Sequence, residues 1–258
     1  YGGAGLGITE AAIFLQAVGG TGRAGQAAPA VPPNNFGPSP TLPFGTEEQR
    51  RKYLPGVAAG EIFFSIGMSE PDSGSDLASV RTRGVKVDGG WLITGRKVWT
   101  SKAVEADRIL LLTRTTPLDQ CAKPTQGMSL FLVDRHAPGV GVVPIPKLGR
   151  NAVASCETTY DDVVVPVADR VGDEGDGFRY LLDGLNAERV LIAAEALGIG
   201  RASLRRAVDY ANDRVVFGRP IGQNQGIAFP LAEAHARLRA AALMVREAAE
   251  RIDAGLPC

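Results

Sequence analysis

Two short stretches of the sequence carry side chains suited to holding a flat ligand with polar edges. Residues 66–76 follow an apolar run and are rich in Ser, Gly and Asp, and such a loop brings N–H groups and hydroxyls close to a ligand. Residues 91–101 alternate like a strand and end in Trp99, Thr100 and Ser101. An aromatic wall beside hydroxyl donors suits a heteroaromatic ring. Spacing alone leaves two interpretations open, a cofactor pocket and an ordinary hairpin.

A single carboxylate is the best candidate for acid–base chemistry. Glu188 follows Leu181 by seven residues and Leu185 by three, which places it on the apolar stripe of a predicted helix, and Glu195 shares that stripe. Burial disfavours the charged form of a carboxylate and raises its pKa towards values that suit a general base. The alternative is a partly exposed Glu that is paired with Arg189 or with another neighbour.

The helix that carries Glu188 belongs to a predicted helical hairpin. Its apolar stripe recurs at helical spacing, at Leu181, Leu185, Ile192 and Ile199. The stripe predicts a helix over residues 177–214, a break at 217–220 and a second helix over 228–254. Such a hairpin is normally half of an antiparallel four-helix bundle, so we expect a chain that is truncated at both ends.

Short β-rich runs fill the middle of the sequence, between residue 63 and about residue 171. The runs are 79–87, 91–94, 108–113, 128–133, 140–146 and 158–165. Asp88-Gly89-Gly90 is a hairpin signal between the first two. Strands at this spacing, without intervening helices, indicate a small barrel or sandwich.

The first part of the chain is predicted to be helical. Thr9 is the expected N-cap of a helix over residues 10–18, and Thr46 with Gln49 forms a capping box for a helix that ends at Pro55. The predicted fold is therefore α+β and multidomain. It has a partial N-terminal helical domain (1–62), a central β-barrel or sandwich domain (63–174) and a partial C-terminal helical bundle (175–258).

Composition excludes several classes of protein. Lys plus Arg and Asp plus Glu both number 28, which gives no support for nucleic-acid binding or a polybasic membrane patch. No apolar run approaches the ~18 residues of a membrane span. The cysteines at 121, 156 and 258 are far apart and odd in number, so neither a zinc site nor a disulfide framework is indicated. A reducing compartment is expected.

The two stretches, read residue by residue, resemble a known family. Ile66-Gly-Met-Ser-Glu-Pro-Asp-Ser-Gly-Ser-Asp76 and Trp91-Leu-Ile-Thr-Gly-Arg-Lys-Val-Trp-Thr-Ser101 closely resemble the two signature segments of the acyl-CoA dehydrogenases. These are flavoenzymes that desaturate acyl thioesters. The resemblance runs through almost the whole chain and implies FAD as the cofactor.

The resemblance implies which residues hold the FAD. In the family the first segment wraps the flavin and the second places a Trp and a hydroxyl against its ring. A third segment, 214–225, resembles one whose Arg, Phe and Gln reach the FAD of a neighbouring subunit. The implied cofactor-binding residues are Ile66, Met68, Ser69, Gly74, Ser75, Trp99, Thr100, Ser101, Arg214, Phe217 and Gln225.

The resemblance also implies a base and a substrate site. Most acyl-CoA dehydrogenases take their base from nearer the carboxyl terminus, whereas the isovaleryl and long-chain types use a Glu on this helix that is followed by Arg. Glu188 and Arg189 match that arrangement, so Glu188 is the expected catalytic residue. Ser75, Asn186 and Arg189 are the expected substrate-binding residues, and no metal is expected.

The implied reaction is α,β-desaturation of an acyl-CoA. The implied partners are the acyl-CoA substrate, an electron-transferring flavoprotein as electron acceptor, and further copies of the chain in a homotetramer. The expected compartment is the bacterial cytoplasm or the mitochondrial matrix, with the true N-terminus missing from this sequence. Two alternatives stay open, an acyl-CoA oxidase and a catalytically silent fragment or paralogue that only binds CoA esters or partners.

Overall fold

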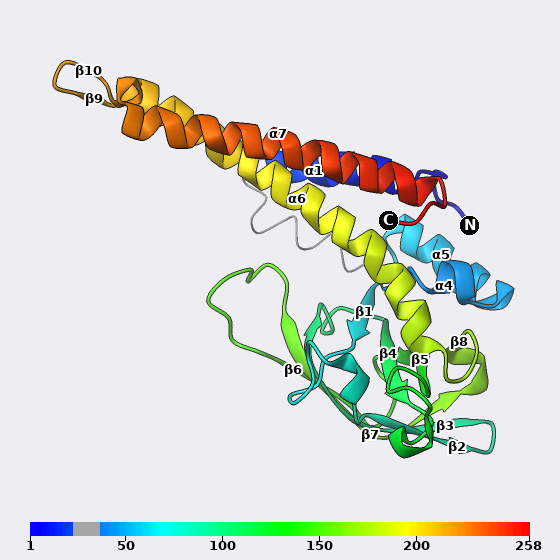
Figure 1. Ribbon diagram of the computed structural model, residues 1–258. Helices are drawn as coiled ribbons and strands as arrows, with labels where there is room; N and C mark the ends of the chain where they lie inside the picture. The colour runs from blue at the N-terminus through cyan, green and yellow to red at the C-terminus, as the bar shows by residue number, and fades with distance from the viewer. Residues whose placement is uncertain (23–36) are drawn as a thin grey trace. The chain divides into compact units, whose positions relative to one another are not determined.

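A computed structural model describes residues 1–22 and 37–258 of the chain (Figure 1). The chain divides into two compact units, one of residues 1–4 and 29–185 and one of residues 5–28 and 186–258. The first unit contains the sheet and the helices over residues 41–59, and the second contains the helix over residues 8–20 and most of the two longest helices of the described chain. The α+β class and the succession of helical, β and helical regions are confirmed, while the three domain boundaries stay a prediction.

The first unit is built on one eight-stranded sheet. Its strands are β1 (Phe64–Gly67), β2 (Arg83–Val87), β3 (Gly90–Ser101), β4 (Arg108–Arg114), β5 (Met128–Asp134), β6 (Val140–Pro144), β7 (Ser155–Pro166) and β8 (Arg170–Val171). They pair in the order β6-β7-β3-β2-β4-β5-β8, with β1 added beside β4. The predicted hairpin is confirmed, because β2 and β3 pair antiparallel and Val87 lies opposite Gly90.

The sheet packs apolar side chains into two clusters, one on each side of its central strands. Leu110 and Leu112 of β4 belong to the first cluster, and Leu111 between them belongs to the second. Alternate residues of a strand point to opposite faces, so an uninterrupted apolar run such as that of β4 is buried on both sides. The central strands are therefore rigid supports for the loops at their ends.

Two helices, α4 (Thr41–Phe44) and α5 (Glu47–Ala59), lie in the same unit. The capping box is confirmed, since the Thr46 hydroxyl accepts from the Gln49 N–H and the Gln49 amide oxygen accepts from the Thr46 N–H. The predicted end at Pro55 is wrong. Pro55 lies inside the helix, which continues to Ala59 and ends at Gly60 with φ 74°. Burial of Tyr53 in the first apolar cluster and of Leu54 outweighs the single backbone hydrogen bond that proline removes.

The second unit contains α1 (Ile8–Gly20), most of α6 (Gly177–Asp213), the hairpin β9 (Val215–Val216) and β10 (Arg219–Pro220), and α7 (Gln225–Asp253). The prediction that Thr9 caps α1 is wrong, because the helix begins two residues earlier than predicted, at Ile8, and its N-cap is Gly7. The Asp253 carboxylate at the end of α7 instead accepts from the N–H groups of Ile8 and Thr9, at 2.7 and 2.9 Å. No helix in the described part of the chain is long and apolar enough to cross a membrane.

The predicted apolar stripe of α6 is only partly correct. Leu181 is buried, but Ile192 and Ile199 are exposed, and the buried positions after residue 190 include Leu191 and Glu195. The two sets of residues seven apart behave differently: Glu195 and Ala202, which continue the set of Leu181 and Glu188, are buried, whereas Ile192 and Ile199, which continue the set of Leu185, are exposed. The buried face of this part of α6 therefore follows the positions of Glu188 and Glu195, and the positions of Ile192 and Ile199 lie outside it.

Candidate functional site

The two signature segments lie side by side in the first unit. The Val98 N–H of β3 donates to the Ser69 carbonyl at 2.9 Å. Further along, the Ser65 hydroxyl of β1 donates to the Ser101 carbonyl at 2.6 Å. These bonds tie the end of β1 and the residues after it to the second half of β3. The structure thus brings together residues 66–69 and 99–101, which are far apart in the sequence.

The loop that follows β1 is held by its own hydroxyl groups. Glu70 and Ser73 exchange two backbone hydrogen bonds, and the side chains of Ser73 and Ser79 both donate to the Asp76 carbonyl. These bonds leave the tip of the loop, Gly74 and Ser75, exposed. The predicted ligand-binding residues of the tip are therefore accessible and lie on a well-tethered loop.

The side chains of Ile66 and Met68 face the protein interior, although both residues were predicted to bind the cofactor. Both side chains pack against the first apolar cluster and are only partly exposed. Their backbone groups, and the partly exposed Ser69, are therefore what this part of the segment offers to a ligand.

Trp99 is presented to the surface in a strained conformation. Its φ is 62°, in the left-handed region that costs a large side chain about 1–2 kcal/mol, and its side chain is 60% exposed. The pairing of β3 with β7 shifts register between Lys97 and Thr100, so a bulge turns Trp99 outwards. An exposed aromatic ring held by a strained backbone points to a binding role.

The two hydroxyls after Trp99 point to different places. Thr100 is fully buried, with its hydroxyl 3.4 Å from that of Thr158, which lies 3.2 Å from the Tyr160 hydroxyl. Ser101 is exposed. The side chain that can reach a ligand from this segment is thus Ser101, while the Thr100 side chain ends a buried row of hydroxyls.

Glu188 lies on α6 in the second unit. Its side chain is half-buried, and burial raises the pKa of its carboxyl, although the positive charge of Arg189 opposes this. Within the residues that the structure describes, the Glu188 carboxylate makes no hydrogen bond and no ion pair. The alternative in which Glu188 is a salt-bridge partner of Arg189 therefore finds no support in the contacts of α6.

Arg189 bonds to the other predicted substrate-binding residue of this turn. Its guanidinium donates to the Asn186 amide oxygen at 2.6 Å, and both side chains are exposed. Residues three apart are neighbours on a helix surface. Asn186, Glu188 and Arg189 thus form one compact group, with a partly desolvated carboxylate beside an exposed guanidinium and amide.

The third predicted segment forms the far end of the second unit. Phe217 and Gly218, with φ of 52° and 74°, make the two-residue turn of the β9–β10 hairpin, which Figure 1 shows as a thin projection beyond the helices. Phe217 is 100% exposed. Arg214 and Gln225 flank the hairpin and are also exposed. Like Trp99, Phe217 is an aromatic residue with a strained backbone and an exposed ring.

Glu188 and Arg214 are too far apart to act on the same small molecule. They are separated by roughly 26 residues of continuous helix, which at 1.5 Å per residue is about 39 Å. The two predicted groups of the second unit, 186–189 and 214–225, are therefore separate in space.

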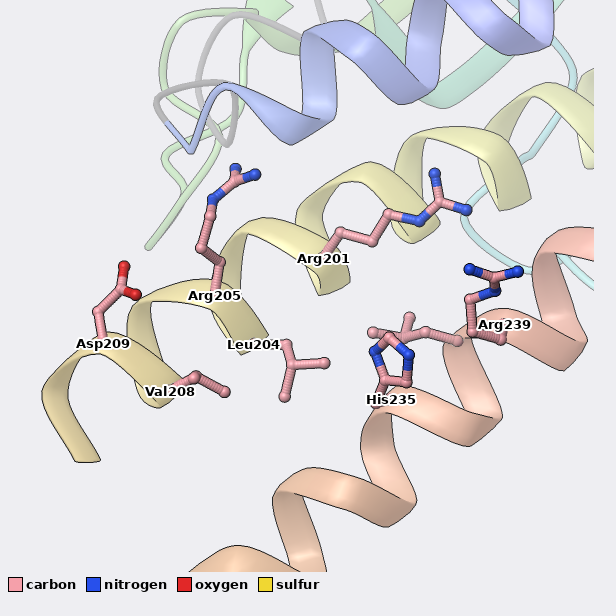
Figure 2. Close-up of a pocket in the computed structure, with 8 residues that line it drawn as sticks. Arg201, Leu204, Arg205, Val208, Asp209, His235 and Arg239 are labelled. Carbon is pink, nitrogen blue, oxygen red and sulfur yellow. The ribbon is translucent and has the colours of Figure 1, made fainter. Parts of the chain in front are cut away.

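A groove of about 480 Å³ lies between α6 and α7 (Figure 2). Its lining residues are Arg201, Leu204, Arg205, Val208, Asp209, His235, Leu238 and Arg239. None of the site residues predicted from the sequence is among them. Arg201 donates to the Gln16 side chain and Arg205 to the Gly20 carbonyl, both at 2.8 Å. Two of its cations thus connect α6 to α1, and the groove is not the candidate site.

Comparison with known proteins assigns the whole chain to one family. The models for the N-terminal, middle and C-terminal domains of acyl-CoA dehydrogenases match residues 1–61, 65–163 and 175–258. An acyl-CoA dehydrogenase of Bacillus subtilis (strain 168) is 39% identical over 100% of this chain and 67% of its own length. The chain belongs to the acyl-CoA dehydrogenase family.

Solved structures of similar proteins agree with this membership. The acyl-CoA dehydrogenase from Geobacillus kaustophilus has a TM-score of 0.93 and 29% identity, over 100% of this chain and 67% of that one. The FAD complex of PigA has a TM-score of 0.91 and 27% identity, over 99% and 66%. The chain therefore spans about two thirds of the length of the family members that it matches.

One feature of the family's flavin segments was missed in the sequence. Lys97 is fully buried and its ammonium lies 2.9 Å from a carboxylate oxygen of Glu70, which is 8% exposed. The sequence feature that could have revealed this pair was a Lys between Gly95 and Trp99 in an otherwise strand-like run. Because lysine is almost never fully buried without a partner, its position on the inward face predicts an acidic residue nearby.

Proposed function

We propose that this chain carries the base and the cofactor-binding segments of an FAD-dependent acyl-CoA dehydrogenase that desaturates the α,β bond of an acyl thioester. The observation that carries the proposal is Glu188, a half-buried carboxylate that makes no hydrogen bond or ion pair in the described chain and stands beside Asn186 and Arg189. Family membership supplies the reaction class.

The residues of the first unit fit a flavin. An exposed aromatic ring at Trp99, an exposed hydroxyl at Ser101 and the exposed loop tip at Ser75 lie on segments that are bonded to each other. When bound, FAD supplies the acceptor for the β-hydride of the substrate. The protein itself contributes an aromatic wall and polar groups for the edge of the ring, and Ser75 on the tip suits a position between the cofactor and the CoA ester.

Glu188 is proposed to remove the α-proton of the thioester. A carboxylate that is partly withdrawn from water holds a proton more readily, so it is a stronger base than an exposed glutamate. The proton passes from the α-carbon to a carboxylate oxygen of Glu188, and the resulting neutral carboxyl suits its half-buried position. Asn186 and Arg189 then hold the nucleotide end of CoA, since a guanidinium donates two parallel bonds to one phosphate.

Arg214, Phe217 and Gln225 are proposed to serve the FAD of another copy of the chain. They lie about 39 Å along the helix from Glu188, their side chains are exposed, and Phe217 has a strained backbone at the tip of a hairpin. This arrangement supports the homotetramer implied by the resemblance.

The visible spectrum of the purified chain tests the proposal directly. A yellow preparation whose flavin absorbance bleaches on anaerobic addition of one acyl-CoA ester is the expected result. A preparation that stays colourless with added FAD would show that this polypeptide does not hold the cofactor. Slow reoxidation of the bleached protein in air, with rapid reoxidation by an electron-transferring flavoprotein, distinguishes the dehydrogenase from an acyl-CoA oxidase.

Glu188 is expected to set the pH dependence of the reaction, and Arg189 is expected to shift it. Burial raises the pKa of Glu188 above its ordinary value of 4.5, and Arg189 opposes that rise. Because the base must be deprotonated, kcat/KM should fall as the pH drops through this raised pKa. Arg189→Gln should move the acid limb of the kcat/KM profile to higher pH. Arg237→Gln, which breaks only the exposed pair with Glu233, should leave the limb in place.

Trp99 is expected to contribute to cofactor affinity and not to stability. Trp99→Gly removes the exposed ring and also the left-handed strain, so its unfolding temperature should equal or exceed that of the wild type. Loss of one stacking contact, worth about 1–3 kcal/mol, should weaken FAD binding by roughly tenfold. Titration of the apo-protein with FAD measures the affinity. Trp91→Phe, in the second apolar cluster, should lower stability and leave the affinity unchanged.

A further inference from the structure

The buried ion pair of Lys97 and Glu70 joins the two segments that are proposed to hold the flavin. Lys97 is on β3, two residues before Trp99, and Glu70 follows β1 by three residues. Their side chains are 0% and 8% exposed and 2.9 Å apart. Apolar residues of similar volume often stabilise a fold as well as a buried ion pair does. A role in positioning the backbone around it would account for a pair in this place.

The Glu70 carboxylate connects the start of the 70–82 loop to its end. One of its carboxylate oxygens accepts from the Arg81 N–H at 2.7 Å. The other accepts from the Thr82 N–H at 2.8 Å and from Lys97. The segment 70–82, with Gly74 and Ser75 at its tip, is therefore closed by one carboxylate.

Lys97 fixes the direction of one peptide group in the first segment. Its ammonium donates to the Met68 carbonyl at 3.0 Å, which turns that carbonyl towards the interior. The peptide bond is trans, so its N–H, which belongs to Ser69, points the opposite way. No described residue accepts a hydrogen bond from this N–H. The ammonium thus directs a free backbone donor away from the interior.

Gly67, which ends β1, lies beside the Lys97 stem. A Cβ atom at Gly67 would lie 3.0 Å from the Leu111 side chain and 3.4 Å from Cγ of Lys97. A larger residue at this position would therefore press first on Leu111 and would only touch the Lys97 stem.

We propose that Lys97 and Glu70 are positioning residues, which hold the Met68–Ser69 peptide with its N–H directed at the cofactor and keep the 70–82 loop closed around it. This proposal rests on the proposed function, because the cofactor is the acceptor that the Ser69 N–H would meet. Neither side chain takes part in the reaction.

Hydrogen exchange of the apo-protein and FAD titration together test the proposal. Lys97→Met should speed exchange of the amides in 68–82 and 95–101 at least tenfold and raise the FAD dissociation constant at least tenfold. The control is Val163→Ala, a cavity in the second apolar cluster, compared at a temperature where the two variants are equally stable. Exchange that is no faster in Lys97→Met than in the control would overturn the proposal.

A double variant without either charge separates the effect of the ion pair on FAD binding from its effect on stability. The double variant Lys97→Met with Glu70→Gln removes both charges, so it should recover thermal stability relative to Lys97→Met alone while its FAD affinity stays low. Wild-type affinity in either variant would show that the pair only stabilises the fold. If the wild-type chain does not bind FAD, the proposed function fails, and the exchange rates still decide whether the pair holds the loop.

Discussion

Glu188→Gln is expected to lower the rate of flavin reduction by acyl-CoA by about 10²–10⁴-fold, the usual contribution of a general base. The glutamine keeps the volume of the side chain and cannot accept a proton. Because Glu188 makes no hydrogen bond or ion pair in the described chain, the substitution should leave the unfolding temperature and the FAD affinity close to those of the wild type. Anaerobic stopped-flow measurement of flavin bleaching gives the rate.

Glu195→Gln is the matched control for this variant. Glu195 lies on the same helix, seven residues further on, and at 8% exposure it is more deeply buried than Glu188. The same chemical change at this position should leave the bleaching rate within a few-fold of the wild type. Equal rate losses in the two variants would show that the helix responds to any change of buried charge. A wild-type rate in Glu188→Gln would refute its role as the base.

Lys97→Met should destabilise the protein by about 3–5 kcal/mol, the usual cost of leaving one partner of a buried ion pair without the other. The loss corresponds to a fall in unfolding temperature on the order of 10 °C. Denaturant unfolding at pH 7 measures it. Breaking the half-exposed pair of Arg108 and Asp134 by Asp134→Asn should cost far less, because solvent screens that interaction.

The stability of Lys97→Met and that of Glu70→Gln should change with pH in opposite directions. Burial alone would raise the pKa of Glu70, but the Lys97 ammonium and two N–H donors hold it below the ordinary value. Burial lowers the pKa of Lys97 to about 8, although Glu70 opposes this.

Without Lys97, the pKa of Glu70 in the folded state rises above its unfolded value, so Lys97→Met should regain stability as the pH falls from 7 towards 5. Without Glu70, the pKa of Lys97 drops further below its unfolded value. Glu70→Gln should therefore regain stability as the pH rises through that lowered pKa, which lies below 8, towards the ordinary lysine value of 10.5. A deficit that does not change with pH in either variant would contradict the ionised state of the pair.

The sequence predicted most of the architecture because local signals and tertiary packing agree there. The hairpin at Asp88-Gly89 and the capping box at Thr46 are set by residues within a few positions, and both are confirmed. Pro55 shows the limit of such signals. A proline argues locally for a helix end, yet buried neighbours extend the helix past it.

Contacts between distant residues were beyond sequence reasoning. Asp253 caps α1 from the far end of the chain, and no local pattern links it to Thr9. The opposite orientations of Thr100 and Ser101 depend on a bulge in the β3–β7 pairing, which alternation alone does not reveal. The sequence pattern identified the candidate segment 91–101. Which of its side chains face outwards depends on the backbone conformation around Trp99.

Two defective genes for this protein should be able to complement each other. Complementation follows from the proposal that one chain supplies the base of one site and the arginine of another, with about 39 Å of α6 between Glu188 and Arg214. A cell that produces both Glu188→Gln and Arg214→Ala chains would assemble mixed pairs, each with one site that has an intact base and an intact arginine. Random pairing would restore about a quarter of the wild-type sites, which neither variant chain can form by itself.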